Sequence, residues 1–330
     1  MSDPTQLRRA VPFRPPARVT IVAGKGGVGK TTVAAALAVL GASAGLRVLI
    51  VEVEGKSGLP ELFDRDETLT YSTGTLLEAG SDGSGGPGSV DARTLTPDDA
   101  LVEYLEDRGM KRISRRLAST GTLDVIATAV PGIKDILVLG KVKQIEQQMG
   151  AGLEGAPDWV VVDAPAAGHA VSFLSSAYGL LEAAAAGPIR AQAADVVGML
   201  SDPQRCQVML VTLPEETPVN EAVETAFHLE DRAGVKLAPI VVNGLWPHLD
   251  LPDQPADALA ASLAVDPGTA RRILRAAAFR RSRQDQQEQQ CRRLAAELPL
   301  DQIPLPYLFT TDLGLAETRR LAEALGEGMR

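Results

Sequence analysis

The residues with the clearest chemical purpose form one short run near the amino end of the chain. The run GKGGVGKTT, residues 24–32, satisfies the spacing G-x-x-x-x-G-K-[ST]. This is the pattern of a phosphate-binding loop, in which backbone N–H groups and a lysine hold nucleotide phosphates and a hydroxyl binds Mg²⁺. The run follows an apolar segment, residues 19–23, that favours a buried strand, and it precedes a predicted helix from about Lys30. Since the motif and both of its flanking elements coincide, the sequence predicts a nucleotide site here.

The type of each loop residue predicts its role. Glycines let the backbone curl so that successive N–H groups face the phosphate oxygens, and the following helix adds the positive end of its dipole. Lys30 would place its charge on the β- and γ-phosphates, the Thr31 hydroxyl would ligate Mg²⁺, and Thr32 would reach the α-phosphate. The expected nucleotide-binding set in this loop is Gly24, Gly26, Gly27, Val28, Gly29, Lys30, Thr31 and Thr32.

A second predicted strand brings a carboxylate to the same site. The apolar run at residues 159–162 is followed directly by Asp163. Because the carboxyl ends of parallel strands share one edge of a sheet, this carboxylate would face Lys30 and the metal. We therefore predict a Mg²⁺ site made by Thr31 and Asp163.

The elements that must position these residues are strands alternating with helices. Right-handed crossovers between parallel strands predict an α/β fold with a doubly wound, mostly parallel sheet. We expect residues 1–17 to be a flexible arm and residues 18–330 a single domain, with a helical and loop insertion at about 64–120. The apolar runs that favour buried strands are residues 19–23, 47–53, 123–128, 159–162, 208–213 and 239–242, with a last strand near Ile303.

Composition disfavours several classes of function. The chain has 33 basic and 42 acidic residues and a formal net charge of −9, which opposes binding to nucleic acid or to anionic membranes. Its two cysteines lie outside any CxxC pattern, and no run approaches the roughly 18 apolar residues of a membrane span. We expect a cytoplasmic protein without a nucleic-acid partner and without stable membrane insertion.

Three segments resemble one known family. With its second lysine, Lys25, the loop resembles the deviant Walker A loop of the signal-recognition, MinD and BioD class. The run DAPAAGH at residues 163–169 resembles the DTAPTGH switch of arsenite-pump ATPases and of the ATPases that guide tail-anchored membrane proteins. The run VPGIKD at residues 130–135 is similar to a PGIDE segment of the latter. The chain thus resembles the anion-transporting ATPase family, in its actinobacterial form with a single phosphate loop.

The resemblance implies binding of ATP and Mg²⁺ between two subunits, with Lys25 of each subunit reaching the nucleotide of the other. Gly168 matches the glycine whose N–H senses the γ-phosphate. Asn243 matches the residue that reads the adenine edge, although an isolated asparagine can also simply end a strand. Pro306 lies in a segment similar to the one that closes the base pocket. His169 belongs to the moving switch, where an orienting role is favoured over acid or base chemistry.

The main departure from the family is at residues 54–57. Glu54 stands where the family has the aspartate that positions the attacking water, and the next three residues replace proline, alanine and histidine. The extra methylene displaces the carboxylate by about 1 Å, enough to slow hydrolysis. With Lys25, Lys30 and Glu54 as the catalytic set, the chain is expected to be either a retuned homodimeric ATPase or a weakly hydrolysing, regulatory subunit of a heterodimer with a paralogous ATPase.

Other functions fit the residues less well. The amphipathic run at residues 133–150 predicts a helix that either lines a groove for a hydrophobic helical client or faces the core. A positioning ATPase like MinD or ParA would need a basic face or tail that the charge balance does not indicate. A nitrogenase-reductase-like protein would need cysteines beside the second switch, and the cysteines here lie well downstream of it.

Overall fold

An eight-stranded sheet forms the centre of the protein. The computed structural model describes residues 13–53, 58–78, 88–107, 109, 132–165, 167–250 and 254–330. The strand order is β3-β4-β2-β5-β1-β6-β7-β8, and the neighbours in the described sheet pair in parallel except for β3 and β4. The strands are β1 Val19–Ala23, β2 Arg47–Val53, β3 Gly74–Leu77, β4 Ser89–Leu95, β5 Trp159–Asp163, β6 Cys206–Thr212, β7 Ile240–Leu245 and β8 Gln302–Pro306.

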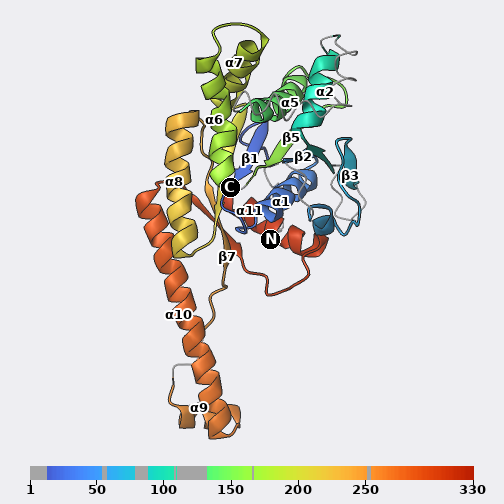
Figure 1. Cartoon of the computed structure of the whole chain (residues 1–330). Helices are drawn as coiled ribbons and strands as arrows, with labels where there is room; N and C mark the ends of the chain where they lie inside the picture. The colour runs from blue at the N-terminus through green and yellow to red at the C-terminus, as the bar shows by residue number, and fades with distance from the viewer. Residues whose placement is uncertain are drawn as a thin grey trace, which may run out of the picture.

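Helices cover both faces of this sheet (Figure 1). On one face, α1 and α11 pack against the side chains of alternate strand residues; on the other face, α5, α6, α7 and α8 do the same. The helices are α1 Lys30–Ser43, α2 Pro97–Asp107, α5 Ile133–Gly150, α6 Ala167–Ala183, α7 Pro188–Leu200, α8 Glu216–Ala233, α9 Ala256–Leu263, α10 Pro267–Glu297 and α11 Leu315–Gly328, with a 3₁₀ turn η1 at Pro60–Phe63. The doubly wound, mostly parallel α/β fold is therefore confirmed.

The region expected to be a helical and loop insertion, residues 64–120, contains two strands. β4 pairs with all seven residues of β2, and β3 pairs with β4 on its other side. In β4 the residues Val90 and Ala92 are buried between the less buried polar residues Asp91 and Arg93. Alternation of this kind marks a half-buried strand, whereas a search for continuous apolar runs finds only fully buried strands. Residues 79–87 of this insertion and the strand predicted at 123–128 lie outside the described residues.

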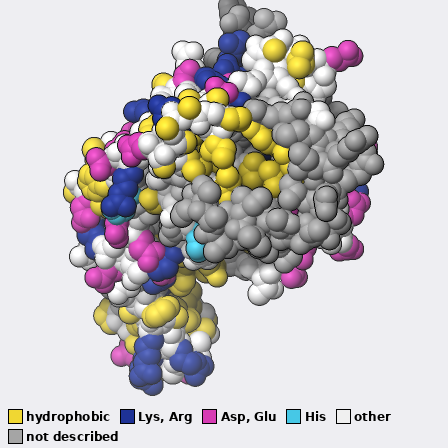
Figure 2. Space-filling view, turned by 45° about the horizontal axis from the view of Figure 1, so that its top comes forward, with side chains coloured by type: hydrophobic (Ala, Val, Ile, Leu, Met, Phe, Trp, Pro, Cys, Tyr) yellow, Lys and Arg dark blue, Asp and Glu magenta, His cyan; other side chains and the backbone are white. Residues whose placement is uncertain are grey.

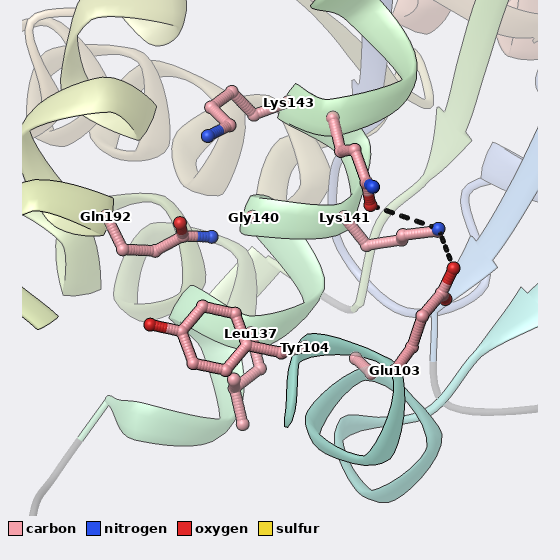
Figure 3. Close-up of a pocket in the computed structure, with 9 residues that line it drawn as sticks. Glu103, Tyr104, Leu137, Gly140, Lys141, Lys143 and Gln192 are labelled. Atoms are coloured by element: carbon pink, nitrogen blue, oxygen red, sulfur yellow. Dashed lines mark hydrogen bonds and ion pairs between the residues drawn. The ribbon is translucent and has the colours of Figure 1, made fainter. Parts of the chain in front are cut away.

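The insertion is tied to the body through α2 and α5. Lys141 of α5 forms an ion pair with Glu103 of α2, and Tyr71 donates a hydrogen bond to the same carboxylate. Glu103 and Lys141 line a cavity of about 180 Å³ together with Tyr104 and Gln192 (Figure 3). Burial alone would raise the pKa of Glu103, but the hydrogen bonds from lysine and tyrosine outweigh it, so that the pKa lies below its ordinary value.

The apolar residues of α5 belong to the core. Ile136, Val138, Leu139 and Val142 are each 2% exposed or less and pack against the sheet. This burial agrees with the alternative in which the helix predicted at residues 133–150 faces the core. The first described residues also contact the body, because the ring of Phe13 lies 5.6 Å from that of Trp159.

A long helix projects from the body. At 31 residues and 1.5 Å per residue, α10 is about 46 Å long, and its amino-terminal half carries α9 at the far end (Figure 1). Asp266 caps α10 by accepting hydrogen bonds from the N–H groups of Gly268 and Thr269. Where α10 leaves the body, the guanidinium of Arg280 lies 4.5 Å from the ring centre of Trp246, at the end of β7. Among the described residues, no helix combines the length and apolar character that a membrane span requires.

Candidate functional site

The loop between β1 and α1 has a backbone that its glycines make possible. Gly24, Gly27 and Gly29 have φ angles of 154°, 85° and 93°, in the region that side chains with a Cβ disfavour. A Cβ on Gly24 would lie 2.3 Å from the carbonyl oxygen of Val211 in β6. One on Gly29 would lie 2.4 Å from the side-chain nitrogen of Asn243. The loop is thus pressed against the ends of the neighbouring strands at Gly24 and Gly29, with no room for a larger residue at these two positions.

This packing predicts a sharp difference between two glycines of one loop. Gly24→Ala is expected to lower the free energy of unfolding by about 1–3 kcal/mol, because it combines backbone strain with a backbone clash. Nucleotide affinity is expected to fall at least about tenfold as the loop is displaced. Gly26→Ala is the matched control, since a Cβ at Gly26 meets nothing within 4 Å. Chemical unfolding of both variants tests this, and equal losses of stability would contradict it.

Thr31 and Asp163 come together across the site. The Thr31 hydroxyl, in the first turn of α1, donates a 2.6 Å hydrogen bond to the Asp163 carboxylate at the end of β5. Asp163 is only 1% exposed. A hydroxyl and a carboxylate are the hard oxygen donors that Mg²⁺ prefers, and they suffice where nucleotide phosphates and water supply the other ligands. The residues present therefore fit Mg²⁺ bound together with a nucleotide.

The two lysines of the loop point to different partners. The Lys30 ammonium donates a 3.0 Å hydrogen bond to the carbonyl oxygen of Lys25, so that it lies across the loop that it belongs to. Lys30 is 8% exposed. The Lys25 side chain is 40% exposed, and its ammonium lies 2.5 Å from the carboxylate of Glu221 on α8. The Lys30 ammonium is thus held within the phosphate loop, whereas the Lys25 ammonium pairs with a carboxylate on α8.

The ends of β7 and β8 lie next to the loop. The Asn243 side chain donates a 2.9 Å hydrogen bond to the carbonyl oxygen of Val28, which ties the end of β7 to the phosphate loop. Pro306 ends β8 in register with Leu245. The structure therefore places Asn243 and Pro306 on adjacent strand ends at the edge of the sheet that carries the loop.

The remaining predicted residues are placed less completely. Thr32 is the third residue of α1 and is half-buried. Gly168 lies in the first turn of α6, directly after the strand that ends in Asp163, and His169 beside it is exposed. Glu54, the predicted water-positioning residue, lies outside the described residues.

Sequence reasoning missed one polar pair at this site. Glu52 in β2 is 1% exposed, and its carboxylate accepts a 2.8 Å hydrogen bond from the hydroxyl of Thr94 in β4. A signal for Glu52 was present, since it is a charged residue near the end of the otherwise apolar strand RVLIVEV. Thr94 had no such signal, because its strand was not predicted.

Comparisons with known proteins agree with this geometry. Residues 17–183 match the family model described as Anion-transporting ATPase. The ATPase BagA of Mycobacterium tuberculosis is 35% identical over 247 residues, which cover 72% of this chain and 68% of BagA. An arsenical pump-driving ATPase of Escherichia coli is 27% identical over 265 residues, 73% of this chain and 41% of that protein. The chain is a member of the anion-transporting ATPase family and an ATPase.

Proposed function

We propose that two subunits bind Mg-ATP between them and hydrolyse it to ADP and phosphate, with closure of the dimer in the ATP state. The observation that carries this proposal is the hydrogen bond between Thr31 and Asp163 beside the phosphate loop. It shows that the two predicted metal-binding groups are in direct contact. Mg²⁺ held there would neutralise charge on the phosphates. In this proposal the buried Lys30 contributes a second positive charge at the β- and γ-phosphates.

The other groups act on the γ-phosphate and on the base. We assign Gly168 the sensing of the γ-phosphate through its N–H, because it lies in the first turn of the helix that follows Asp163. Asn243 and Pro306 would contact the adenine. The Asn243 amide, which donates a hydrogen bond to the carbonyl of Val28, would either keep that hydrogen bond or replace it with one to the base. Glu54 would orient the attacking water, and hydrolysis would be slow if its longer side chain places the carboxylate poorly.

Lys25 is the group that connects the two subunits in this proposal. Its ammonium is surface-accessible and already pairs with a carboxylate, Glu221, which it would exchange for the phosphates of the partner subunit's nucleotide. A homodimer is the simplest arrangement, and a heterodimer in which a paralogous ATPase supplies the faster site is the alternative.

Breaking the Lys25–Glu221 pair should therefore favour the closed dimer. Glu221→Gln is expected to strengthen ATP-dependent dimerisation by up to about fivefold, the free energy of an exposed ion pair. Analytical ultracentrifugation with and without Mg-ATP measures this, and Glu224→Gln on the same helix is the control. If wild type stays monomeric with Mg-ATP and assembles only with a paralogous ATPase, the homodimer is wrong and the heterodimer replaces it.

A hydrophobic helix of another protein is the client that we propose for the moving dimer. Support comes from the apolar side chains that gather on the face seen in Figure 2. α5 contributes little to such a surface, because its apolar residues are buried against the sheet.

A further inference from the structure

A helical arm extends past the edge of the sheet that carries the phosphate loop. α10 runs antiparallel to the strands beside it. The Cys291 carbonyl accepts a hydrogen bond from Gln302 at the start of β8, whereas the Gln287 amide donates one to Gly244 near the end of β7. Residues 267–279 therefore continue beyond the carboxyl end of β7, for about 20 Å at 1.5 Å per residue (Figure 1).

The arm, defined as α9 together with residues 267–279, has a small core of its own. Leu259, Ala260 and Ala270 are buried together, apart from the two clusters that cover the faces of the sheet. Phe279, where the arm meets the body, is 67% exposed. The arm is thus attached to the body at one end, with a large apolar side chain exposed at its base.

The α10 part of the arm and its base are strongly basic. Residues 267–283 contain six arginines and no lysine or acidic residue. This segment carries +6 in a chain whose formal charge is −9, which leaves −15 for the rest. Arg271, Arg272 and Arg275 are exposed. Because exposed charges of one sign attract the opposite sign over about 8–10 Å, the surface that suits this arm is acidic.

Exposed acidic residues follow the strands on the other side of the same edge. They lie at residues 61–67, after β2, and in the first turn of α2, after β4. Arg65 is the one basic residue among them. The strand order places β2 and β4 on one side of β1, which leads into the phosphate loop, and β7 and β8 on the other. The exposed carboxylates are those of Glu61, Asp64, Asp66, Glu67, Asp98 and Asp99.

We propose that the arm of each subunit binds the acidic side of a second copy of this chain in the ATP-bound dimer, a claim that rests on the proposed function. Subunits that share nucleotides across their phosphate loops face each other with the edges that carry those loops. A two-fold axis perpendicular to the sheets then sets the β7–β8 side of one subunit opposite the β2–β4 side of the other. The arm extends in that direction, so its arginines would meet the partner's carboxylates. Phe279 would supply an aromatic contact beside them, a combination common where interfaces bind most strongly.

Charge reversal on one face of the arm tests this. Arg271→Glu/Arg275→Glu changes two exposed residues one helical turn apart. Ultracentrifugation with Mg²⁺ and a non-hydrolysable ATP analogue measures the Kd of dimerisation. We expect this Kd to rise about 30-fold at 0.15 M salt but less than about threefold at 1 M, where charges are screened beyond about 3 Å. The matched control is Arg232→Glu/Lys236→Glu, an exposed pair of the same spacing at the opposite edge, which should change the Kd less than about twofold.

The reciprocal change is Asp66→Lys/Glu67→Lys on the acidic side. Alone it should weaken dimerisation by a similar factor. Combined with the arm reversal in one chain, it should restore the Kd to within about threefold of wild type, because each reversed arm then meets a reversed surface.

The outcomes separate this inference from the proposed function. If wild type dimerises with the nucleotide and the arm variant does so equally well, or if the combined variant is no better than either change alone, the inference is wrong. Assembly of wild type with a paralogous ATPase alone would also overturn it, because the occupant would not be a second copy. If wild type binds the nucleotide but stays monomeric in every mixture, the proposed two-subunit function itself fails.

Discussion

Lys30→Ala is expected to lower the rate of ATP hydrolysis at least about 100-fold while the protein stays folded. Lys30 is the buried ammonium of the phosphate loop, and a preorganised positive charge at the transferring phosphoryl group contributes about two to three orders of magnitude in rate. Its ammonium donates to the carbonyl of Lys25 within the same loop, and alanine favours the first turn of α1 where Lys30 stands, so that the substitution should leave the fold intact. Phosphate release in Mg-ATP measures the rate, and circular dichroism checks the fold.

The matched control for Lys30→Ala is Lys236→Ala, which removes one charge from an exposed residue between α8 and β7. It should hydrolyse ATP within about twofold of wild type, as exposed substitutions away from a site generally do. A Lys30→Ala protein within threefold of wild type would show that the loop does not hold the reacting phosphates.

The largest expected loss of stability comes from Glu146→Ala. The Glu146 carboxylate on α5 is 1% exposed and forms ion pairs of 2.5 Å with Arg18 and 2.6 Å with Arg205. These two arginines directly precede β1 and β6, which are adjacent parallel strands of the sheet. Removing the shared carboxylate leaves two guanidinium groups facing each other at a partly buried place, which costs about 3 kcal/mol, or about 4 °C in Tm for 330 residues.

The pH dependence of this effect has a definite sign. Burial alone would raise the pKa of Glu146, but hydrogen bonds from Arg205 and Arg18 outweigh it and hold the pKa below its ordinary value of 4.5. A depressed folded-state pKa contributes stability that is fully present above the unfolded-state pKa and is lost as pH falls through the folded-state value. The difference in unfolding free energy between wild type and Glu146→Gln should thus be constant from pH 6 to 7 and shrink below about pH 4.5. A difference that grows on acidification would contradict this account.

The sequence predicted those elements that depend only on short stretches of consecutive residues. The phosphate loop, the strands β1 and β2 and the helix α1 begin where the sequence indicates, because continuous apolar runs mark strands buried on both faces and glycines mark the turn between them. Asp163 was placed at a strand end by the same reasoning, and its contact with Thr31 follows from the shared edge of parallel strands.

The features that were missed depend on pairing between distant segments. Thr94 donates to Glu52 across 42 positions of sequence, and nothing in either local pattern predicts that β4 pairs with β2 in that register. The projection of α10 from the body likewise depends on tertiary contacts, such as that between the Arg280 guanidinium and the ring of Trp246. The Lys25–Glu221 pair likewise joins a loop to a helix nearly 200 residues later.

The most direct test of the composite site is to mix two inactive proteins, Lys25→Ala and Lys30→Ala, and to measure phosphate release. Each variant alone lacks one lysine in both sites of its homodimer. In a mixed dimer, the Lys25→Ala subunit keeps its own Lys30 and receives Lys25 from its partner, so that one complete site is restored. An equimolar mixture should recover about a quarter of the wild-type rate, since about half the dimers are mixed and each has one working site. If both variants are inactive and the mixture also stays inactive, Lys25 does not act across the interface and the two-subunit site is wrong.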